Sequence, residues 1–406
     1  MFGRRIARLG SAPVRPFGRG VARHASTVPL RPFLVEQYSG WFDGSDSLSS
    51  SECEPLTLRQ LLDMADGESR QQWEELNLGY PAFNTGSQAL REQIAAQYDA
   101  LSADGQVNVC APQEGISLAM HALLEPGDHV IATTPCYQSL TEVARSIGCQ
   151  ITDWDPEFDG GRPWFSPDVL ARLLSSNPGT RLLVANFPHN PTGALPTPAE
   201  FAAIVEECRR AGCALFVDEM YRGLEHSGRE RLPAAVDAYP ERGVSLGGLS
   251  KSYGLPGLRI GWLACRDTAL MQQVSLLKDY STICPPVPSE ALGLIALRNR
   301  ERIEAANRSR LALGLSAVRD FIHAHEAQFE WCEPAGGTMA FPRIRDADVS
   351  AEAYAEALRA RAGLMLMPSS HFAFADDRLR VCFGRDTEAT VERLARWSDD
   401  VARYGV

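Results

Sequence analysis

Residues 247–262 read GGLSKSYGLPGLRIGW, and this stretch determines how the rest of the chain is interpreted. It places Lys251 among glycines and small residues after a short apolar strand predicted at Val244–Gly247, and another strand is predicted at Ile260–Ala264. Lys251 is not a P-loop lysine, because that motif has glycine immediately before the lysine and Ser250 stands there. Alone, such a lysine could equally be a surface residue of a turn, so neighbouring segments must decide.

Short apolar runs alternate with helical patterns before this stretch. Such alternation predicts parallel strands joined by crossover helices, with a ligand crevice at the carboxyl ends of the strands. The predicted strands are His129–Thr133, Leu182–Phe187 and Ala214–Val217, and the predicted helices are Thr57–Ala65, Gln113–Leu124, Ser139–Ile147 and one that starts at the capping pattern Thr197–Glu200 and ends at Gly212.

The pattern changes near residue 290 to longer helices with two or three strands, such as Thr338–Phe341 and Leu379–Phe383. This change predicts a second domain of α+β type. Its last helix carries one apolar stripe that is expected to be packing surface, made of Val391, Leu394, Trp397 and Val401.

Composition excludes several classes of function. The 406 residues carry a formal charge of −11, which argues against nucleic acid or an anionic membrane as a partner. No run of about 18 apolar residues occurs. The ten cysteines form no Cys-x-x-Cys pair and are expected to be free thiols, and His323 and His325 would face different sides of a helix, so no metal site is expected.

The amino-terminal segment differs from the rest of the chain. Residues 1–31 contain seven arginines, and the first acidic residue is Glu36. This composition predicts a transit peptide at 1–25 and a location in the mitochondrial matrix rather than a plastid, because serines are few. A basic extension without targeting meaning, and hence a cytoplasmic protein, is the alternative.

Two more segments indicate that Lys251 has a functional role: Asn186–Gly193, which reads NFPHNPTG, and Phe216–Tyr221, which reads FVDEMY. The three segments, in this order and spacing, resemble fold-type-I enzymes that use pyridoxal phosphate (PLP), specifically the class I/II aminotransferases. The resemblance extends over essentially the whole chain from about residue 30. It implies an α/β fold, the PLP-dependent transferase fold (type I), with a mostly parallel central sheet in a large domain and a smaller α+β domain.

The expected organisation follows from this resemblance. The transit peptide at 1–25 is followed by an arm at 26–56 that joins the small domain, a large PLP-binding domain at 57–289 and a small carboxyl-terminal domain at 290–406.

The resemblance also assigns catalytic roles. Lys251 would form the Schiff base with PLP and move protons. Asp218 would bind the protonated ring nitrogen, so that the ring can accept electron density; alone, it could be a turn or capping aspartate. Asn190 and Tyr221 match the pair that contacts the phenolic oxygen of the cofactor, although a turn asparagine and a packing tyrosine are the plain alternatives. His189 would lie behind Asp218.

Further residues match the family's binding groups. Tyr137 corresponds to the aromatic residue that stacks on the cofactor ring, with a core tyrosine as the alternative. Arg259 matches the phosphate-binding arginine, and Arg380 matches the one that binds the substrate α-carboxylate. Tyr80 resembles a tyrosine that reaches the phosphate of the neighbouring subunit, which implies a homodimer with shared active sites.

The phosphate site departs from the family pattern. Pro112 stands where a helix start would supply an N–H group, and proline has none. Ala111, Gln113 or a side chain must therefore compensate, with Ser250 among the cofactor contacts. Gly248 occupies a position, three before the lysine, where the family often has a phosphate-binding serine or threonine.

The expected reaction moves an amino group from an amino acid to a 2-oxo acid. The stretches 186–196, 249–262, 336–341 and 379–383 are also similar to capreomycidine-synthase-type enzymes, so elimination or cyclisation on PLP is the alternative. A catalytically inactive member of the fold is a further alternative. Ser275–Lys278 matches a Ser-x-x-Lys pattern, but it lies in a predicted amphipathic helix without companion motifs.

Overall fold

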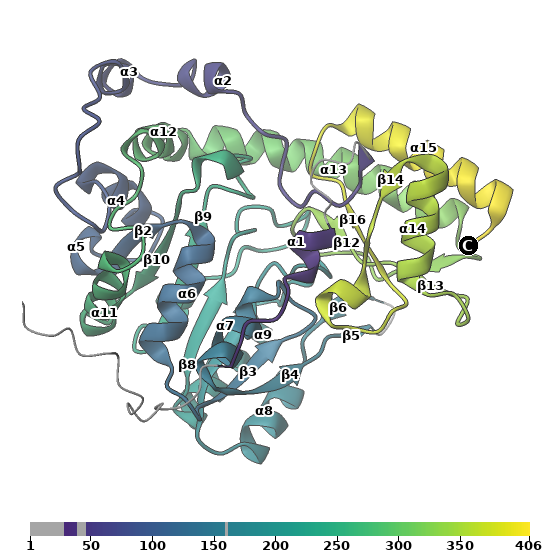
Figure 1. Ribbon diagram of the computed structural model, residues 1–406, viewed down its shortest axis with the longest axis horizontal. Helices are drawn as coiled ribbons and strands as arrows, with labels where there is room; N and C mark the ends of the chain where they lie inside the picture. Colours follow the sequence, from purple (N-terminus) through teal and green to yellow (C-terminus); the bar gives the residue numbers. More distant parts are fainter. Residues whose placement is uncertain (1–27, 39–45, 159–160) are drawn as a thin grey trace, which may run out of the picture.

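The computed structural model describes residues 28–38, 46–158 and 161–406, so the predicted transit peptide at 1–25 lies outside the described residues. A large α/β domain and a smaller domain lie side by side (Figure 1). In the part of the chain that is described, no helix combines the length and the apolar composition that a membrane span requires.

A seven-stranded sheet forms the centre of the large domain. Its strand order is β2-β10-β9-β8-β7-β3-β4. Only β10 runs antiparallel to its neighbours, so the prediction of a mostly parallel sheet is confirmed. The strands are β2 Val107–Cys110, β3 His129–Thr133, β4 Gln150–Trp154, β7 Thr180–Asn186, β8 Ala214–Asp218, β9 Gly243–Gly248 and β10 Gly261–Cys265.

Helices cover both faces of this sheet, so the alternating side chains of each strand are buried on either side. Val130 and Leu182 pack with one layer of helices, while their neighbours Ile131 and Leu183 pack with the other. The first layer contains α6 Pro112–Leu123, α7 Ser139–Ile147 and α11 Thr268–Asp279, and the second contains α8 Pro167–Ser176, α9 Pro198–Ala211 and α10 Ala235–Ala238. A short hairpin joins β5 Glu157–Phe158 to β6 Pro163–Trp164.

The helices begin where the sequence signals place them. Thr197 accepts a hydrogen bond from Glu200 N at the start of α9, and Gly212 ends that helix in the left-handed region. Thr57 and Gln60 form the predicted capping box of α2, but α2 ends at Leu62 rather than Ala65, because i to i+3 bonds replace the helical ones there.

A third helical group covers the β2 end of the sheet. It comprises α2 Leu58–Leu62, α3 Gly67–Glu74, α4 Gln88–Ala95, α5 Ala103–Gln106 and α12 Val287–Arg298. Leu292 and Ile295 of α12 share a core with Ile94 of α4 and Val109 of β2. The domain boundary expected at 289/290 therefore falls inside a helix that belongs to the large-domain core, and the chain passes into the smaller domain along α13.

The smaller domain packs three helices against short strands. Phe321 stacks on Trp397 with ring centroids 4.3 Å apart, and Phe329 meets Trp397 edge-on at 5.2 Å. Val391 is exposed, so it lies outside the packed stripe in which it was expected. The elements are α13 Arg300–Ala324, β11 Phe329–Glu330, β12 Met339–Ala340, β13 Arg343–Ile344, α14 Ala351–Ala362, β14 Leu364–Met365, β15 Met367–Pro368, β16 Leu379–Cys382 and α15 Thr387–Tyr404, with 3₁₀ turns η1 Pro256–Leu258 in the large domain and η2 Ser369–Phe372.

The amino-terminal arm connects both domains. Its first part contains α1 Leu34–Tyr38, where Leu34 N donates to Gln138 Oε1 at the start of α7. Its second part contains β1 Asp46–Ser47, which pairs in parallel with β14 of the smaller domain. The segment that follows bonds to Cys382 of β16 through Leu48 and to Lys251 O through Cys53 N. Residues 48–54 therefore run between the smaller domain and the turn that carries Lys251.

Candidate active site

A cavity of about 740 Å³ opens at the carboxyl ends of the parallel strands, bounded by the arm and the smaller domain. Nine of the residues singled out from the sequence line it: Gln113, Tyr137, Asn190, Asp218, Tyr221, Ser250, Lys251, Arg259 and Arg380. Three others, Ala111, His189 and Tyr80, do not.

Lys251 follows β9 and projects its amine toward the arm. Its Nζ donates to Ser51 Oγ at 2.9 Å and lies 4.0 Å from Glu52 Oε2. Burial lowers the pKa of the Lys251 amine, and the Glu52 carboxylate partly opposes this effect. The neutral amine that acts as a base is therefore easier to reach than in a solvent-exposed lysine.

Asp218 ends β8 and is 6% exposed. Its Oδ1 accepts a hydrogen bond of 3.0 Å from Met220 N. Burial raises the pKa of this carboxyl from 3.8 to about 7, although the Met220 bond and the charge of Lys251 oppose the rise. A buried carboxyl of this kind gains much from a cationic partner.

Asn190 and Arg380 are joined across the domains. Asn190 N donates to Asn186 Oδ1 at 2.7 Å, which fixes the loop after β7. Arg380, on β16, donates through Nη1 to Asn190 Oδ1 at 3.0 Å and through Nη2 to Ser49 O at 2.8 Å. The Nε of Arg380 has no partner among the described residues, so this buried guanidinium keeps a donor for an anion.

Two hydroxyl groups in the cavity wall also lack partners in the described part of the chain. They belong to Tyr221 and Ser250, both buried. Burial raises the pKa of the Tyr221 hydroxyl, which therefore stays protonated and can donate. A buried polar group without a partner is costly unless a ligand supplies one.

Three residues border the aromatic and phosphate side of the cavity. Tyr137 Oη donates to Glu36 Oε1 at 2.8 Å. Gln113, near the start of α6, accepts through Oε1 from Ser139 Oγ at 3.2 Å. Arg259 is exposed, and its Nη1 donates to Pro256 O at 2.9 Å, which leaves its remaining donors for an anion.

Ala111 and His189 differ from their expected roles. The Ala111 N–H donates to Glu114 Oε2 at 3.2 Å within the α6 cap, so it is not a free phosphate donor. The His189 Nδ1 bonds to Thr192 Oγ1 at 2.7 Å, and no contact joins this ring to Asp218. Burial lowers the pKa of His189 to about 3, so the ring is neutral.

Tyr80 lies outside the cavity and is 87% exposed. It therefore contributes nothing to the site of its own chain, and its predicted role depends on a second subunit.

Sequence reasoning missed the arm residues that line the cavity, among them Glu36, Ser51 and Glu52. Ser51 is 200 positions from its partner Lys251, and no local pattern links the two. Only the polar run Ser49–Glu52, in a segment expected to be an arm, is a signal that could have drawn attention to it. No group of three or more metal-ligating side chains occurs within the ranges that the structure describes.

The sequence pattern of the family Aminotransferase class I and II matches residues 57–396. The chain belongs to this family. Capreomycidine synthase of Streptomyces vinaceus is 29% identical over 96% of this chain and 97% of its own length. The probable N-succinyldiaminopimelate aminotransferase DapC of Mycobacterium tuberculosis is 32% identical over 71% of this chain and 73% of its own length. A PLP-dependent aminotransferase from Streptococcus suis has a TM-score of 0.84 at 26% identity, covering 93% of this chain and 99% of that one.

The cofactor of this aminotransferase is pyridoxal phosphate. The cavity fits such a group, because it brings together an amine at Lys251, a buried carboxyl at Asp218, the unpartnered hydroxyls of Tyr221 and Ser250, and the guanidinium of Arg259. These are partners for an aldehyde, a ring nitrogen, a phenolic oxygen and a phosphate. The PLP-dependent fold expected from the sequence is confirmed.

Proposed function

We propose that this aminotransferase acts on an amino acid whose side chain is positively charged, and that it passes the amino group to a 2-oxo acid. The observation that supports this substrate class is Glu36, a carboxylate that lines the cavity and has no cationic partner among the described residues.

The arginines of the cavity argue against a second substrate carboxylate. Arg259 and Arg380 are the proposed partners of the cofactor phosphate and the substrate α-carboxylate. The two that remain are already paired: Arg385 Nε donates to Glu52 Oε1 at 3.0 Å, and Arg393 Nη2 lies 3.6 Å from Asp46 Oδ1. A dicarboxylic substrate would therefore have to break an existing ion pair.

Glu36 favours a positively charged substrate side chain over a carboxylate. It is half-buried on α1, and its hydrogen-bond partner among the described residues is the neutral hydroxyl of Tyr137. Its negative charge contributes to raising the pKa of the Lys251 amine, which indicates that it acts on the site interior. A guanidinium or ammonium group on the substrate side chain would give this carboxylate an ionic partner.

The residues of the chain then have defined tasks. PLP supplies an aldehyde for the substrate amine and a ring that accepts electron density when the Cα–H bond breaks. We assign Asp218 to the ring nitrogen, Tyr221 and Asn190 to the phenolic oxygen, and Arg380 to the substrate α-carboxylate. Lys251 accepts the proton from substrate Cα at its Nζ and returns it later in the reaction, which its lowered pKa favours.

A homodimer is part of this proposal. The loop that carries Tyr80 is tied to α11 by Asn84, whose Nδ2 donates to Asp279 Oδ1 at 2.7 Å. Large apolar side chains on this loop and after α11 are more than half exposed, which is typical of an interface. They are Leu78, Tyr80, Phe83, Tyr280 and Ile283. Tyr80 would reach the phosphate site of the second subunit.

We also propose a mitochondrial location, supported by the seven arginines and absent acidic residues of the first 31 positions. Fusing residues 1–31 to a fluorescent protein tests this directly. A diffuse cytoplasmic signal would contradict the proposal.

The substrate class is tested with purified holoenzyme, pyruvate or 2-oxoglutarate, and a panel of basic, dicarboxylic and apolar amino acids. We expect the highest kcat/KM for a basic amino acid. Glu36→Gln should lower that value about tenfold, since a charge-assisted hydrogen bond is lost, and should leave leucine unaffected. A preference for glutamate or aspartate, or an equal loss for leucine, would refute the assignment.

The same assay addresses elimination or cyclisation. The similarity to capreomycidine synthase over almost the full chain supports this alternative. Transamination turns over repeatedly only when a 2-oxo acid acceptor is present and otherwise stops after one equivalent of product per active site, whereas elimination or cyclisation continues without an acceptor. Turnover that needs no acceptor would show that the reaction is elimination or cyclisation rather than transamination.

A further inference from the structure

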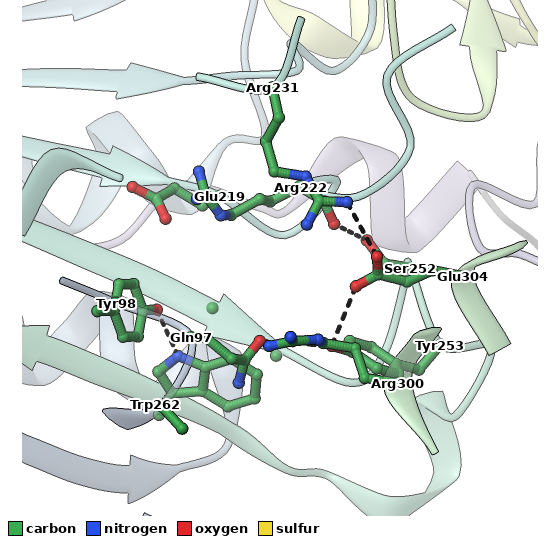
Figure 2. A pocket seen from close by; sticks show the side chains of 13 residues that line it. Gln97, Tyr98, Glu219, Arg222, Arg231, Ser252, Tyr253, Trp262, Arg300 and Glu304 are labelled. Atoms are coloured by element: carbon green, nitrogen blue, oxygen red, sulfur yellow. Dashed lines mark hydrogen bonds and ion pairs between the residues drawn. The ribbon is translucent and has the colours of Figure 1, made fainter. Parts of the chain in front are cut away.

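A second cavity, of about 120 Å³, lies between the large domain and the start of α13, and it shares no lining residue with the cofactor site. Glu219 and Gly247 line it, whereas their neighbours Asp218 and Leu246 line the cofactor cavity. Trp262, which pairs with Gly247, also lines the smaller cavity, so most of its lining lies on the face of β9 opposite Leu246; Gly248, at the end of β9, borders it as well. We call it the Glu219–Arg300 pocket, after two of its lining residues (Figure 2).

Hydrogen-bond donors without acceptors surround this pocket. Arg300 has no ion pair or hydrogen bond within the described ranges, and the buried Nε2 of Gln97 has no acceptor there. Tyr98 Oη accepts from Trp262 Nε1 at 2.7 Å, so its own proton remains to be donated. Arg222 uses Nη1 on Leu232 O and keeps its other donors.

Most carboxylate oxygens of the pocket already have partners. Glu304 already accepts from Arg231 at 2.9 Å and from Arg308 at 3.4 Å. Glu219 is 6% exposed, and its Oε1 accepts from Ala235 N and Ser245 Oγ, both at 2.7 Å. Its Oε2 has no partner in the described chain, and burial raises the pKa of this carboxyl, although Arg222 and the bonds from Ala235 and Ser245 oppose the rise.

The space and its entrance suit a small ion. A volume of about 120 Å³ is open to the centres of water-sized molecules, which is several times the ~10–15 Å³ that one water needs. An open pocket of about 380 Å³ adjoins it, with Arg231, Arg300 and Glu304 lining both. Arg229 and Arg308 also line this outer pocket, together with Glu225 and Glu301. Its four arginines exceed its three glutamates by one, so the entrance is weakly basic.

We propose that the Glu219–Arg300 pocket binds one small oxyanion, inorganic phosphate or a short carboxylate, through Arg222, Arg300 and the Gln97 amide. The free donors of the pocket outnumber its free acceptors, and an oxyanion would supply the missing acceptors because it presents them on all sides. Figure 2 shows these three side chains around the space between Glu219 and Glu304. The ion would lie across the sheet from the cofactor, next to Glu219, which follows Asp218 in the sequence.

The proposal is tested by isothermal titration of holoenzyme, in buffer free of phosphate and carboxylates, with inorganic phosphate in one series and acetate in another. We expect one site per chain for at least one of the two ions. Arg300→Gln should weaken its binding about tenfold or more. Arg302→Gln is the matched control, because Arg302 is exposed on the same helix and does not line the pocket.

The outcome is decided by comparing the two variants. Both should keep the visible absorbance of bound PLP, which shows that they fold and that the cofactor phosphate site is filled. Absence of binding of both ions to the wild-type holoenzyme, or an equal effect of the two substitutions, would overturn the proposal. Phosphate binding without acetate binding would identify the ligand as phosphate-like, and the reverse as a carboxylate.

Discussion

Replacing Asp218 by asparagine should make the cofactor-free protein more stable at alkaline pH. Burial raises the pKa of Asp218 from 3.8 to about 7. Between these values the folded protein keeps a proton that the unfolded chain has lost, so this group's contribution to the free energy of unfolding falls as the pH rises. At about 1.36 kcal/mol per pH unit, the full cost above pH 7 is roughly 4 kcal/mol, of which about 2–3 kcal/mol develops between pH 5 and pH 8.

The measurement is urea unfolding of cofactor-free wild type, Asp218→Asn and a control, Asp399→Asn, at pH 5 and pH 8. Asp399 is exposed on α15 and should behave as wild type. The wild-type protein should lose about 2–3 kcal/mol more than Asp218→Asn across this interval. Equal losses in the two proteins would refute the argument that burial of this carboxyl dominates its titration. Asp218→Asn should also lose activity, because asparagine cannot keep the cofactor ring protonated.

Two further predictions concern binding and packing. Arg380→Lys should raise KM for every amino acid about tenfold or more in steady-state kinetics, because lysine cannot reproduce the guanidinium fork; an unchanged KM would place the α-carboxylate elsewhere. Gly248→Ser should lower the free energy of unfolding by about 1–3 kcal/mol, since a Cβ there would lie 2.8 Å from Met220 Sδ and 3.2 Å from Gly261 Cα. Gly257→Ser, where nothing lies within 4 Å, is the control, and equal urea midpoints of the two variants would contradict this reasoning.

The sheet and the centre of the site were predictable because their signals are local. Lys251 and Asp218 follow or end apolar strands, and parallel strands bring their carboxyl ends to one edge. Periodicity located β3 and α7 at their observed bounds. The ends of β7, β10 and β12 moved by one or two residues, since strand ends depend on pairing partners that the local sequence does not specify.

The remaining features depend on contacts between distant segments. The approach of Ser51 and Glu52 to Lys251 arises from the pairing of β1 with β14, which no local pattern encodes. The sequence favours Ala111 as a phosphate donor, but in the structure its N–H donates to the Glu114 side chain. The boundary inside α12 was misplaced because a change in helix length is visible in the sequence, whereas the side on which a helix packs is not.

The position of the arm limits how much of the chain can be cut away. Val28 N bonds to Ser146 O, Arg31 N to Glu142, and Val35 and Glu36 line the cofactor cavity. A mature protein that begins at residue 26 would keep every one of these contacts. A recombinant version that begins at residue 39 would lack the part of the cavity wall formed by Val35 and Glu36 but would retain both domains. Such a protein would be expected to fold and to have impaired activity.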